Sequence, residues 1–368
     1  MFLWTSLLLL LAYAGLMAYY RRGWGRLRSP EVREASIPIT VLIPARNEAD
    51  RIGALLQALN HQTYTRFDVI VIDDHSTDGT SEVVRPFLSE RIRLIQPAAD
   101  AAHSSKKKAI DAGVRAAAGT LIVTTDADCL PPAGWLSAIA SFAEQTDARF
   151  IAAPVRFTSN GSPLHRFQAL DFLTLQGITA ASVATGFHDL CNGANLAYTK
   201  EAFLAVNGFE GIDGIATGDD LLLMHKIHSR YPDGVHYLKS REAIVTTPPM
   251  PTWSAFLNQR RRWASKSFVY RDYRIIAVIL LVGIVNLWWL VLLTATLQNI
   301  GHWPLLLAFP LFKALAEYAF LQPVARFYGQ QRLLPGLFYF QPLHLLYTVF
   351  VGLWSQFGRY EWKGRITR

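Results

Sequence analysis

Through the first part of the chain's middle region, segments with a strand-type apolar pattern alternate with segments that have a helix-type pattern. Short apolar runs predict strands, and segments in which apolar residues recur every three or four positions predict helices. The predicted strands cover residues 39–43, 67–72, 92–95 and 120–125. The predicted helices cover residues 48–61, 80–88 and 105–118. This alternation predicts an α/β fold with a mostly parallel sheet covered by helices on both faces.

The alternation becomes less regular after Gly134. The pattern there predicts a helix at 135–144, a strand at 150–157 and a longer helix at 164–181. A further helical segment, LLLMHKI, follows the acidic pair Asp219-Asp220. These elements extend the α/β region towards residue 250.

Two parts of the chain are apolar enough to enter a membrane. The run at 2–20 has no basic residue before it and no small-residue cleavage site after it, which favours a permanent anchor over a signal peptide. The second part holds three hydrophobic segments, at 275–297, 303–321 and 333–354. The segment at 275–297 has no charged residue and would be about 34 Å long as a helix, so it is long enough to cross a bilayer.

The other two hydrophobic segments carry polar or helix-breaking residues. Lys313 and Glu317 are four positions apart, so they can pair on one helix face. The last segment contains Pro335 and Pro342. A basic tail follows it, and basic residues favour the cytoplasmic side. We therefore expect the last segment to be re-entrant or partly interfacial rather than a complete span.

Composition agrees with a protein that is partly in lipid. Hydrophobic residues make up 51% of the chain and charged residues 17%, against about 25% charged in soluble domains. The net charge is +8, but the basic residues gather beside the apolar segments rather than along a domain with interleaved aromatic residues. This distribution favours anionic lipid headgroups over nucleic acid as a partner. The two cysteines, Cys129 and Cys191, do not have the spacing of metal ligands. We expect both to stay reduced and to serve as packing residues.

Acidic residues follow the predicted strands where ligands bind in parallel α/β sheets. Asp73 and Asp74 end one strand and Asp126-Ala127-Asp128 another, while the first strand ends in PARNE, without a dinucleotide-binding G-x-G-x-x-G. Asp126 and Asp128 flank one residue, so both carboxylates can reach a single Mg²⁺ or Mn²⁺ whose other ligands are substrate phosphates and water. The alternative is a solvated acidic turn before two prolines.

Three further groups can serve a reaction that displaces a diphosphate. Of the run 106–108, we expect Lys106 to face a phosphate, although charge runs usually form a solvated helix face. Asp219 and Asp220 precede a helix, where carboxylates commonly cap backbone donors, and a carboxylate fixed there can also take a proton from a hydroxyl. Either of the two remains a candidate base.

The last group lies before the membrane segments. Gln259, Arg262 and Trp263 are spaced to share one helix face. This segment can be an ordinary amphipathic interfacial helix. It can also serve chemistry: Arg262 would stabilise diphosphate charge and Trp263 would offer a flat surface to an acceptor.

Between about Pro38 and Tyr270 the chain resembles glycosyltransferase family 2. The resemblance rests on seven motifs in order: IPITVLIPARNE, VIVIDDHSTDGT, SSKKKAIDAG, TLIVTTDADC, CNGANLAY, TGDD and QRRRW. It implies a GT-A fold, an inverting mechanism, a divalent metal (Mg²⁺ or Mn²⁺) and a nucleotide-sugar donor, expected here to be a UDP-sugar. It implies that the following residues contact the nucleotide: Pro44, Ala45, Arg46, Glu48, Asp73, Asp74, Lys106 and Asp126.

The same resemblance assigns the remaining roles. Asp126 and Asp128 match the metal-binding pair, and Asp220 matches the base, beside Asp219 where relatives often carry Glu. Gln259, Arg262 and Trp263 match the Q-x-x-R-W element. That element is similar to polysaccharide synthases of the cellulose, hyaluronan and chitin type, and to ceramide glucosyltransferase and bacterial lipid or carotenoid glycosyltransferases. Few membrane segments are available for an extrusion channel, which favours a single transfer to a lipid hydroxyl over polymer synthesis.

The predicted organisation has five parts: a transmembrane anchor at 1–22, a GT-A catalytic domain at 36–250, an amphipathic interface helix at 251–273, a membrane region at 274–357 and a basic tail at 358–368. Arg21, Arg22, Arg26 and Arg28 follow the anchor, so the positive-inside rule places the catalytic domain in the cytoplasm. We expect an integral protein of a bacterial-type inner membrane whose partners are a nucleotide sugar, a membrane lipid acceptor and the lipid bilayer. The sequence predicts no oligomeric state.

Overall fold

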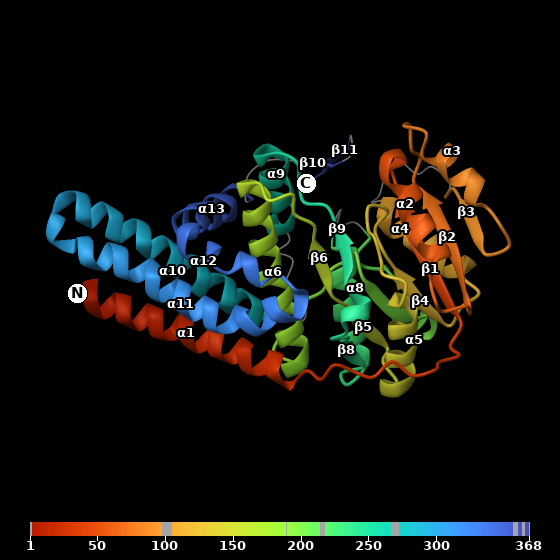
Figure 1. Ribbon diagram of the computed structural model, residues 1–368, viewed down its shortest axis with the longest axis horizontal. Coiled ribbons are helices and arrows are strands. Elements are labelled where there is room, and N and C mark those ends of the chain that lie inside the picture. Colours follow the sequence, from red (N-terminus) through yellow and green to blue (C-terminus); the bar gives the residue numbers. More distant parts are fainter. Residues whose placement is uncertain are drawn as a thin grey trace.

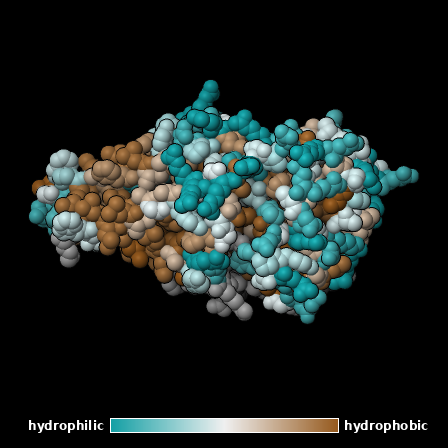
Figure 2. Space-filling view, turned by 90° about the horizontal axis from the view of Figure 1, so that it is seen from below, coloured by the Kyte–Doolittle hydropathy of each residue, from teal (hydrophilic) through white to brown (hydrophobic). Residues whose placement is uncertain are grey.

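The computed structural model describes residues 2–97, 105–188, 190–213, 218–265, 272–355, 360–362 and 365–367. The molecule is elongated, with a group of long helices at one end and a sheet with its helices at the other (Figure 1). Apolar surface gathers over the helical end and hydrophilic surface over the sheet end (Figure 2). The division between lipid-like and water-like composition in the sequence is therefore also a division in space.

The sheet has seven strands in the order β3-β2-β1-β4-β7-β5-β8. Their bounds are β1 Ile39–Ala45, β2 Phe67–Asp73, β3 Ile92–Ile95, β4 Leu121–Thr124, β5 Phe150–Ala152, β7 Leu196–Thr199 and β8 Val235–Tyr237. The pairs β1–β2, β1–β4, β2–β3 and β5–β8 are parallel, and β7 runs antiparallel to both of its neighbours. The mostly parallel sheet expected from the sequence is confirmed.

Helices cover both faces of the sheet, which explains the unbroken apolar runs of its strands. Leu42 and Ile70 face one buried cluster and their neighbours Val41 and Val69 face the other. Residues of α4, α7 and α8 belong to the first cluster and residues of α2, α3 and α5 to the second. These helices are α2 Ala49–Asn60, α3 Thr80–Val84, α4 Ser105–Ala116, α5 Trp135–Thr146, α7 Lys200–Ala205 and α8 Asp219–Arg230.

Two predicted elements are interrupted at prolines. The strand expected at 150–157 divides into β5 and β6 (Val155–Phe157), and β6 pairs with β9 (Val245–Thr247) in a separate sheet. Pro154 lies at the break and has no N–H to donate to a strand ladder. The helix expected at 80–88 changes after Val84 into the 3₁₀ turn η1 (Arg85–Phe87), which contains Pro86.

Three helices are long and apolar enough to cross a membrane: α1 (Phe2–Arg26), α10 (Tyr273–Gln298) and α11 (Trp303–Tyr328), which follows the turn η4 (Ile300–His302). After α11, the turn η5 (Gln331–Leu333) and α12 (Gly336–Tyr339) lead into α13 (Gln341–Trp354). The segments on either side of Phe340 are bent by 78°, the geometry of a broken span or a re-entrant loop. Pro342 lies in the first turn of α13, where a missing N–H is tolerated.

The long helix α6 (Pro163–Thr185) lies between the sheet and the membrane helices (Figure 1). It packs against α1 and α11 on one side and against β6 and β8 on the other. One buried cluster runs from sheet residues such as Ile122 to Tyr20 of α1 and Phe320 of α11. The sheet region and the long apolar helices are therefore packed directly on each other.

Cations of the sheet end hold the ends of two membrane helices. The Lys239 ammonium donates to the carbonyls of Trp24 (3.3 Å) and Leu27 (3.0 Å) at the end of α1. Arg241 donates to the Arg326 carbonyl near the end of α11 (3.0 Å). Positive charges at helix C-termini satisfy free carbonyls and complement the helix dipole.

Nearer the C-terminus, α9 (Trp253–Ala264) packs against α13. Of the predicted interface helix, residues 266–271 lie outside the described residues. The predicted tail contains a short hairpin of β10 (Tyr360–Trp362) and β11 (Arg365–Thr367). The tail residues Arg359, Lys363 and Arg368 are likewise outside the described residues.

Gly119 is expected to be essential for the stability of the sheet. A Cβ there would lie 2.5 Å from the Thr40 amide nitrogen and 2.6 Å from the Ile39 carbonyl carbon. Both atoms belong to strand backbone and cannot rotate away, so we expect Gly119→Ala to destabilise the protein by about 1–3 kcal/mol or more. Thermal unfolding in detergent measures this. Gly53→Ala is the matched control, because a Cβ at this helical position meets only Val83 Cγ1 at 3.5 Å; equal unfolding temperatures would contradict the prediction.

Candidate active site

One cavity of about 700 Å³ brings together nearly all of the predicted site residues. Those that line it are Pro44, Ala45, Arg46, Glu48, Asp74, Lys106, Asp126, Asp128, Asp219, Asp220, Gln259, Arg262 and Trp263. They come from the ends of β1, β2 and β4 and from α4, α8 and α9. The carboxyl edge of a parallel sheet is where such folds bind their ligands.

Arg46 ties the ends of β1 and β2 together at one side of the cavity. Its guanidinium donates to the Asp74 carbonyl (2.6 Å) and lies 4.0 Å from the Asp74 carboxylate. The Asp74 amide in turn donates to the Ala45 carbonyl (2.8 Å). This wall of the cavity is therefore held by both backbone and side-chain contacts.

Asp73 does not line the cavity, in contrast to the other predicted residues. Its side chain is buried and accepts hydrogen bonds from the Ser76 amide (3.0 Å), the Gln96 amide group (3.0 Å) and the Ser81 hydroxyl. Burial alone would raise the pKa of Asp73, but these hydrogen bonds outweigh it and lower the pKa. These contacts fix the turn after β2 and keep the Asp73 carboxylate out of the cavity, in contrast to its predicted contact with a nucleotide.

Asp126 and Asp128 follow β4, and each is paired with a cation. Lys106 Nζ lies 3.0 Å from Asp126 Oδ1, and Arg51 Nη1 lies 3.4 Å from Asp128 Oδ2. Lys106 Nζ also lies 3.5 Å from Asp219 Oδ2, so this ammonium bridges the residues after β4 and those at the start of α8. Lys106 is the lysine of the run that enters the cavity; Lys107 is buried and donates to the Ile212 carbonyl (2.5 Å).

The carboxylates around Lys106 keep it charged. Burial alone would lower the pKa of its ammonium, but attraction to Asp126, Asp219 and Asp220 outweighs burial and raises the pKa well above its usual value. Lys106 therefore offers a permanent positive charge inside the cavity. A phosphate group is the kind of ligand that this charge would attract.

Asp220 is held by backbone donors at the start of α8. Its Oδ2 accepts from the Gly193 amide (2.9 Å) and its Oδ1 from the Leu221 amide (2.8 Å). Gly218 takes the N-cap position with a φ of 82°, so neither aspartate is the N-cap residue itself. A Cβ at Gly193 would lie at ordinary contact distance from Asp220 Oδ2 (3.5 Å) and Lys106 Nζ (3.4 Å), so this backbone contact does not itself require glycine.

Asp126 and Asp128 suit a metal that also binds substrate. Among the described residues, no group of three or more His, Cys, Asp or Glu side chains is placed to hold a metal ion. Mg²⁺ and Mn²⁺ at nucleotide sites commonly take one or two carboxylates and complete their coordination with phosphate oxygens and water. Two carboxylates facing one cavity fit this kind of site.

The helix α9 closes the opposite side of the cavity with Gln259, Arg262 and Trp263. The three arginines of QRRRW have separate environments because successive helical residues point about 100° apart. Arg262 lines the cavity, Arg261 stacks on the Trp354 ring at 4.4 Å, and Arg260 is buried. The spacing argument that placed Gln259, Arg262 and Trp263 on one face is consistent with this arrangement.

Sequence reasoning missed an apolar wall of the cavity. It is formed by Phe157 of β6, Phe172 and Leu175 of α6, and Met250, while Gln176 and Thr179 of α6 add two polar groups beside it. Trp263 is continuous with this wall, since its ring lies 6.2 Å from that of Phe172. The helix α6 was predicted, but its apolar and polar residues are spread around the whole helix, so the sequence marked no face as the one that lines a cavity.

The two cysteines are free, as expected. Burial raises the pKa of the Cys129 thiol, which keeps it protonated and unreactive. Cys191 lines the cavity beside Asn192 and Gly193, a position that its sequence context did not indicate.

The cavity thus combines a charged end with an apolar end. Carboxylates, a permanent ammonium and a guanidinium gather at the sheet edge, and aromatic and aliphatic groups form the wall from α6. Such a site can bind a phosphorylated donor at one end and an apolar molecule with a hydroxyl at the other.

Comparisons with known proteins agree with this geometry. Residues 40–202 match the sequence model of Glycosyl transferase family 2. The chain is similar to glycosyltransferase AglE of Haloferax volcanii, with 29% identity over 151 residues, 40% of this chain and 49% of that protein. It is also similar to 4,4'-diaponeurosporenoate glycosyltransferase of Staphylococcus aureus, with 39% identity over 90 residues, 24% of each chain. The matched regions thus span about half or less of these curated relatives.

The fold is also found among solved structures. The mannosyltransferase PcManGT from Pyrobaculum calidifontis, solved in complex with GDP-Man and Mn²⁺, superimposes with a TM-score of 0.57 at 18% identity, over 97% of this chain and 100% of that one. This confirms the expected GT-A fold. The region that matches glycosyl transferase family 2, residues 40–202, therefore lies between membrane-type helices near both ends of the chain.

Proposed function

We propose that this protein is an inverting glycosyltransferase that moves a sugar from a UDP-sugar to the hydroxyl of a membrane lipid. The observation that carries the proposal is that Asp126, Asp220 and Arg262 line one cavity with an apolar wall. These groups come from three separate parts of the chain. The helix that supplies most of the apolar wall, α6, is also the one that packs on α1 and α11.

The nucleoside diphosphate of the donor is proposed to bind at the carboxyl edge of the sheet. Pro44, Ala45, Arg46, Glu48 and Asp74 would contact the nucleoside part. Lys106 and Arg262 would face the phosphates, where their charges stabilise the diphosphate as it leaves. Asp126 and Asp128 would hold Mg²⁺ or Mn²⁺, which supplies further neutralisation of phosphate charge when bound.

Asp220 is the proposed general base. The acceptor hydroxyl gives its proton to the Asp220 carboxylate as its oxygen forms a bond to the sugar's anomeric carbon. The bond from that carbon to the phosphate oxygen breaks, and its electron pair leaves with the diphosphate. Attack from the side opposite the leaving group inverts the anomeric configuration. The hydrogen bonds from Gly193 and Leu221 hold the carboxylate in one orientation for this transfer.

The apolar wall supports a lipid acceptor over a polar one. Phe172, Leu175 and Met250 offer no hydrogen bond to a sugar chain, while Trp263 offers a flat face. A relative named as the glycosyltransferase of 4,4'-diaponeurosporenoate adds support for this acceptor class. Arg21, Arg22 and Arg26 at the end of α1 support a cytoplasmic catalytic domain.

The test is incubation of detergent-purified protein and Mn²⁺ with a panel of UDP- and GDP-sugars and a total lipid extract, read by mass spectrometry. The GDP-sugars are included because a structural neighbour was solved with GDP-Man. We expect one glycolipid that carries a single added sugar from a UDP donor. A ladder of oligomers would identify a processive polysaccharide synthase instead, and the absence of any transfer would refute the proposed activity.

A further inference from the structure

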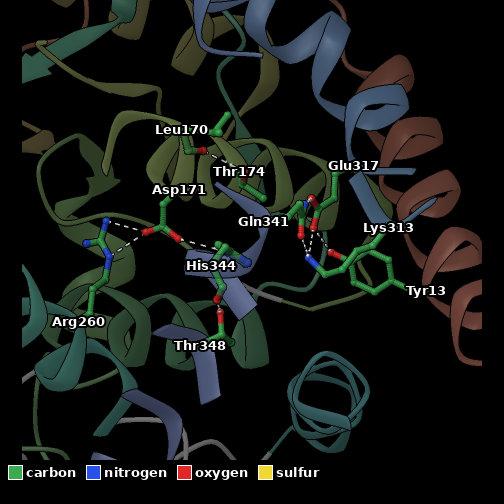
Figure 3. Close-up of polar contacts among 10 residues, drawn as sticks. All are labelled: Tyr13, Leu170, Asp171, Thr174, Arg260, Lys313, Glu317, Gln341, His344 and Thr348. Atoms are coloured by element: carbon green, nitrogen blue, oxygen red, sulfur yellow. Dashed lines mark hydrogen bonds and ion pairs between the residues drawn. The ribbon is translucent and has the colours of Figure 1, made fainter. Parts of the chain in front are cut away.

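Arg260 is a buried cation directly behind the cavity wall. Its side chain is 3% exposed, and it pairs with Asp171 of α6: Nε donates to Asp171 Oδ2 at 2.9 Å, and Nη2 lies 2.8 Å from the same oxygen. The other oxygen of Asp171 lies 3.8 Å from His344 Nε2 on α13. Figure 3 shows Asp171 between Arg260 and His344. The carboxylate of Asp171 thus connects α6 with α9 and α13.

Arg260 also contacts two of the α9 residues that line the cavity. Its Nη1 donates to the Gln259 side-chain oxygen at 2.8 Å, and its guanidinium lies 4.1 Å from the centre of the Trp263 ring. Because the side-chain oxygen of Gln259 accepts this hydrogen bond, Arg260 fixes the orientation of the Gln259 amide group, although Arg260 itself lies outside the cavity. The planar guanidinium likewise supports the ring of Trp263.

We propose that Arg260, anchored by Asp171, is a positioning residue that fixes the Gln259 amide and the Trp263 ring for the acceptor. This inference rests on the proposed glycosyl transfer. Arg260 does not line the cavity, so its effect must pass through these two neighbours. A planar group is needed, because it must donate to Asp171 and Gln259 and lie against an aromatic ring at the same time.

Two variants separate positioning from the stability of a buried ion pair. Arg260→Lys keeps the charge opposite Asp171, but a single ammonium cannot provide the planar fork or the flat contact. Arg260→Met combined with Asp171→Leu removes both charges, since removing only one would leave the other buried and unpaired. Arg261→Lys is the matched control, because Arg261 is the adjacent residue and points towards Trp354 instead.

The measurements are the unfolding temperature, the fraction of sites titrated by UDP, and kcat and KM for the acceptor. For both test variants we expect unchanged UDP titration, a raised acceptor KM and a kcat lowered by about 10²-fold, the scale of a small misplacement at a reacting site. The control should keep the values of the unmodified protein. A merely structural role would reduce the fraction of sites titrated and leave the KM of the remaining sites unchanged.

Normal kcat and KM in either test variant would overturn the positioning role, and so would a loss confined to the fraction of folded sites. Failure of the unmodified protein to transfer any sugar would instead refute the proposed function.

Discussion

Replacing Asp220 by Asn is expected to lower glycosyl transfer by about 10²–10⁴-fold, the range typical of a lost general base. Asn keeps the size of the side chain and one acceptor oxygen for the Gly193 or Leu221 amide, but it cannot take a proton. UDP binding should remain nearly unchanged, because Lys106 and Asp126 are still present. Transfer rates at saturating donor, together with UDP titration, measure the two effects.

Two further variants are measured beside Asp220→Asn. Asp219→Asn tests the neighbouring candidate; since the Asp219 carboxylate lies 3.5 Å from Lys106 Nζ, its loss should act on donor binding more than on the rate at saturating donor. Asp147→Asn is a matched surface control, because Asp147 is 90% exposed and in a left-handed conformation that Asn adopts readily. Substantial turnover by the Asp220 variant would remove it from the base role.

Removing divalent metal is expected to abolish transfer, and added Mg²⁺ or Mn²⁺ should restore it. The structure also predicts an order of binding. Asp126 and Asp128 are paired with Lys106 and Arg51, and the described residues provide no larger group of metal ligands. The protein alone should therefore bind Mn²⁺ weakly, and UDP should strengthen that binding by supplying phosphate ligands.

Calorimetric titration of Mn²⁺ with and without UDP measures this coupling independently of turnover. Asp126→Asn and Asp128→Asn should each reduce it, and the surface variant Asp147→Asn should not. Full transfer activity in the presence of excess chelator would contradict the metal requirement. Tight Mn²⁺ binding without UDP would contradict the predicted order.

Much of the candidate site could be predicted from the sequence, because its polar residues lie directly after the predicted strands. Ala45, Asp74 and Asp126 were placed at one edge from the alternation alone, since parallel strands present their carboxyl ends together. Asp73 shows the limit of that argument. It directly precedes Asp74, yet its side chain points into the fold and accepts three hydrogen bonds. Side chains of successive residues point in different directions, and a sequence of two identical residues does not show which of them faces the cavity.

The sequence by itself determined the alternating α/β region, the membrane-type helices and the charged residues to which we assign the proposed diphosphate binding. These depend on short-range periodicity and composition, which are properties of consecutive residues. Only the tertiary structure decided that α6 lines the cavity with Phe172 and Leu175, that Asp171 meets Arg260, and that the last apolar segment bends by 78°. These contacts join residues far apart in the chain, for example 89 positions for Asp171 and Arg260, and local patterns hold no information on which distant faces meet.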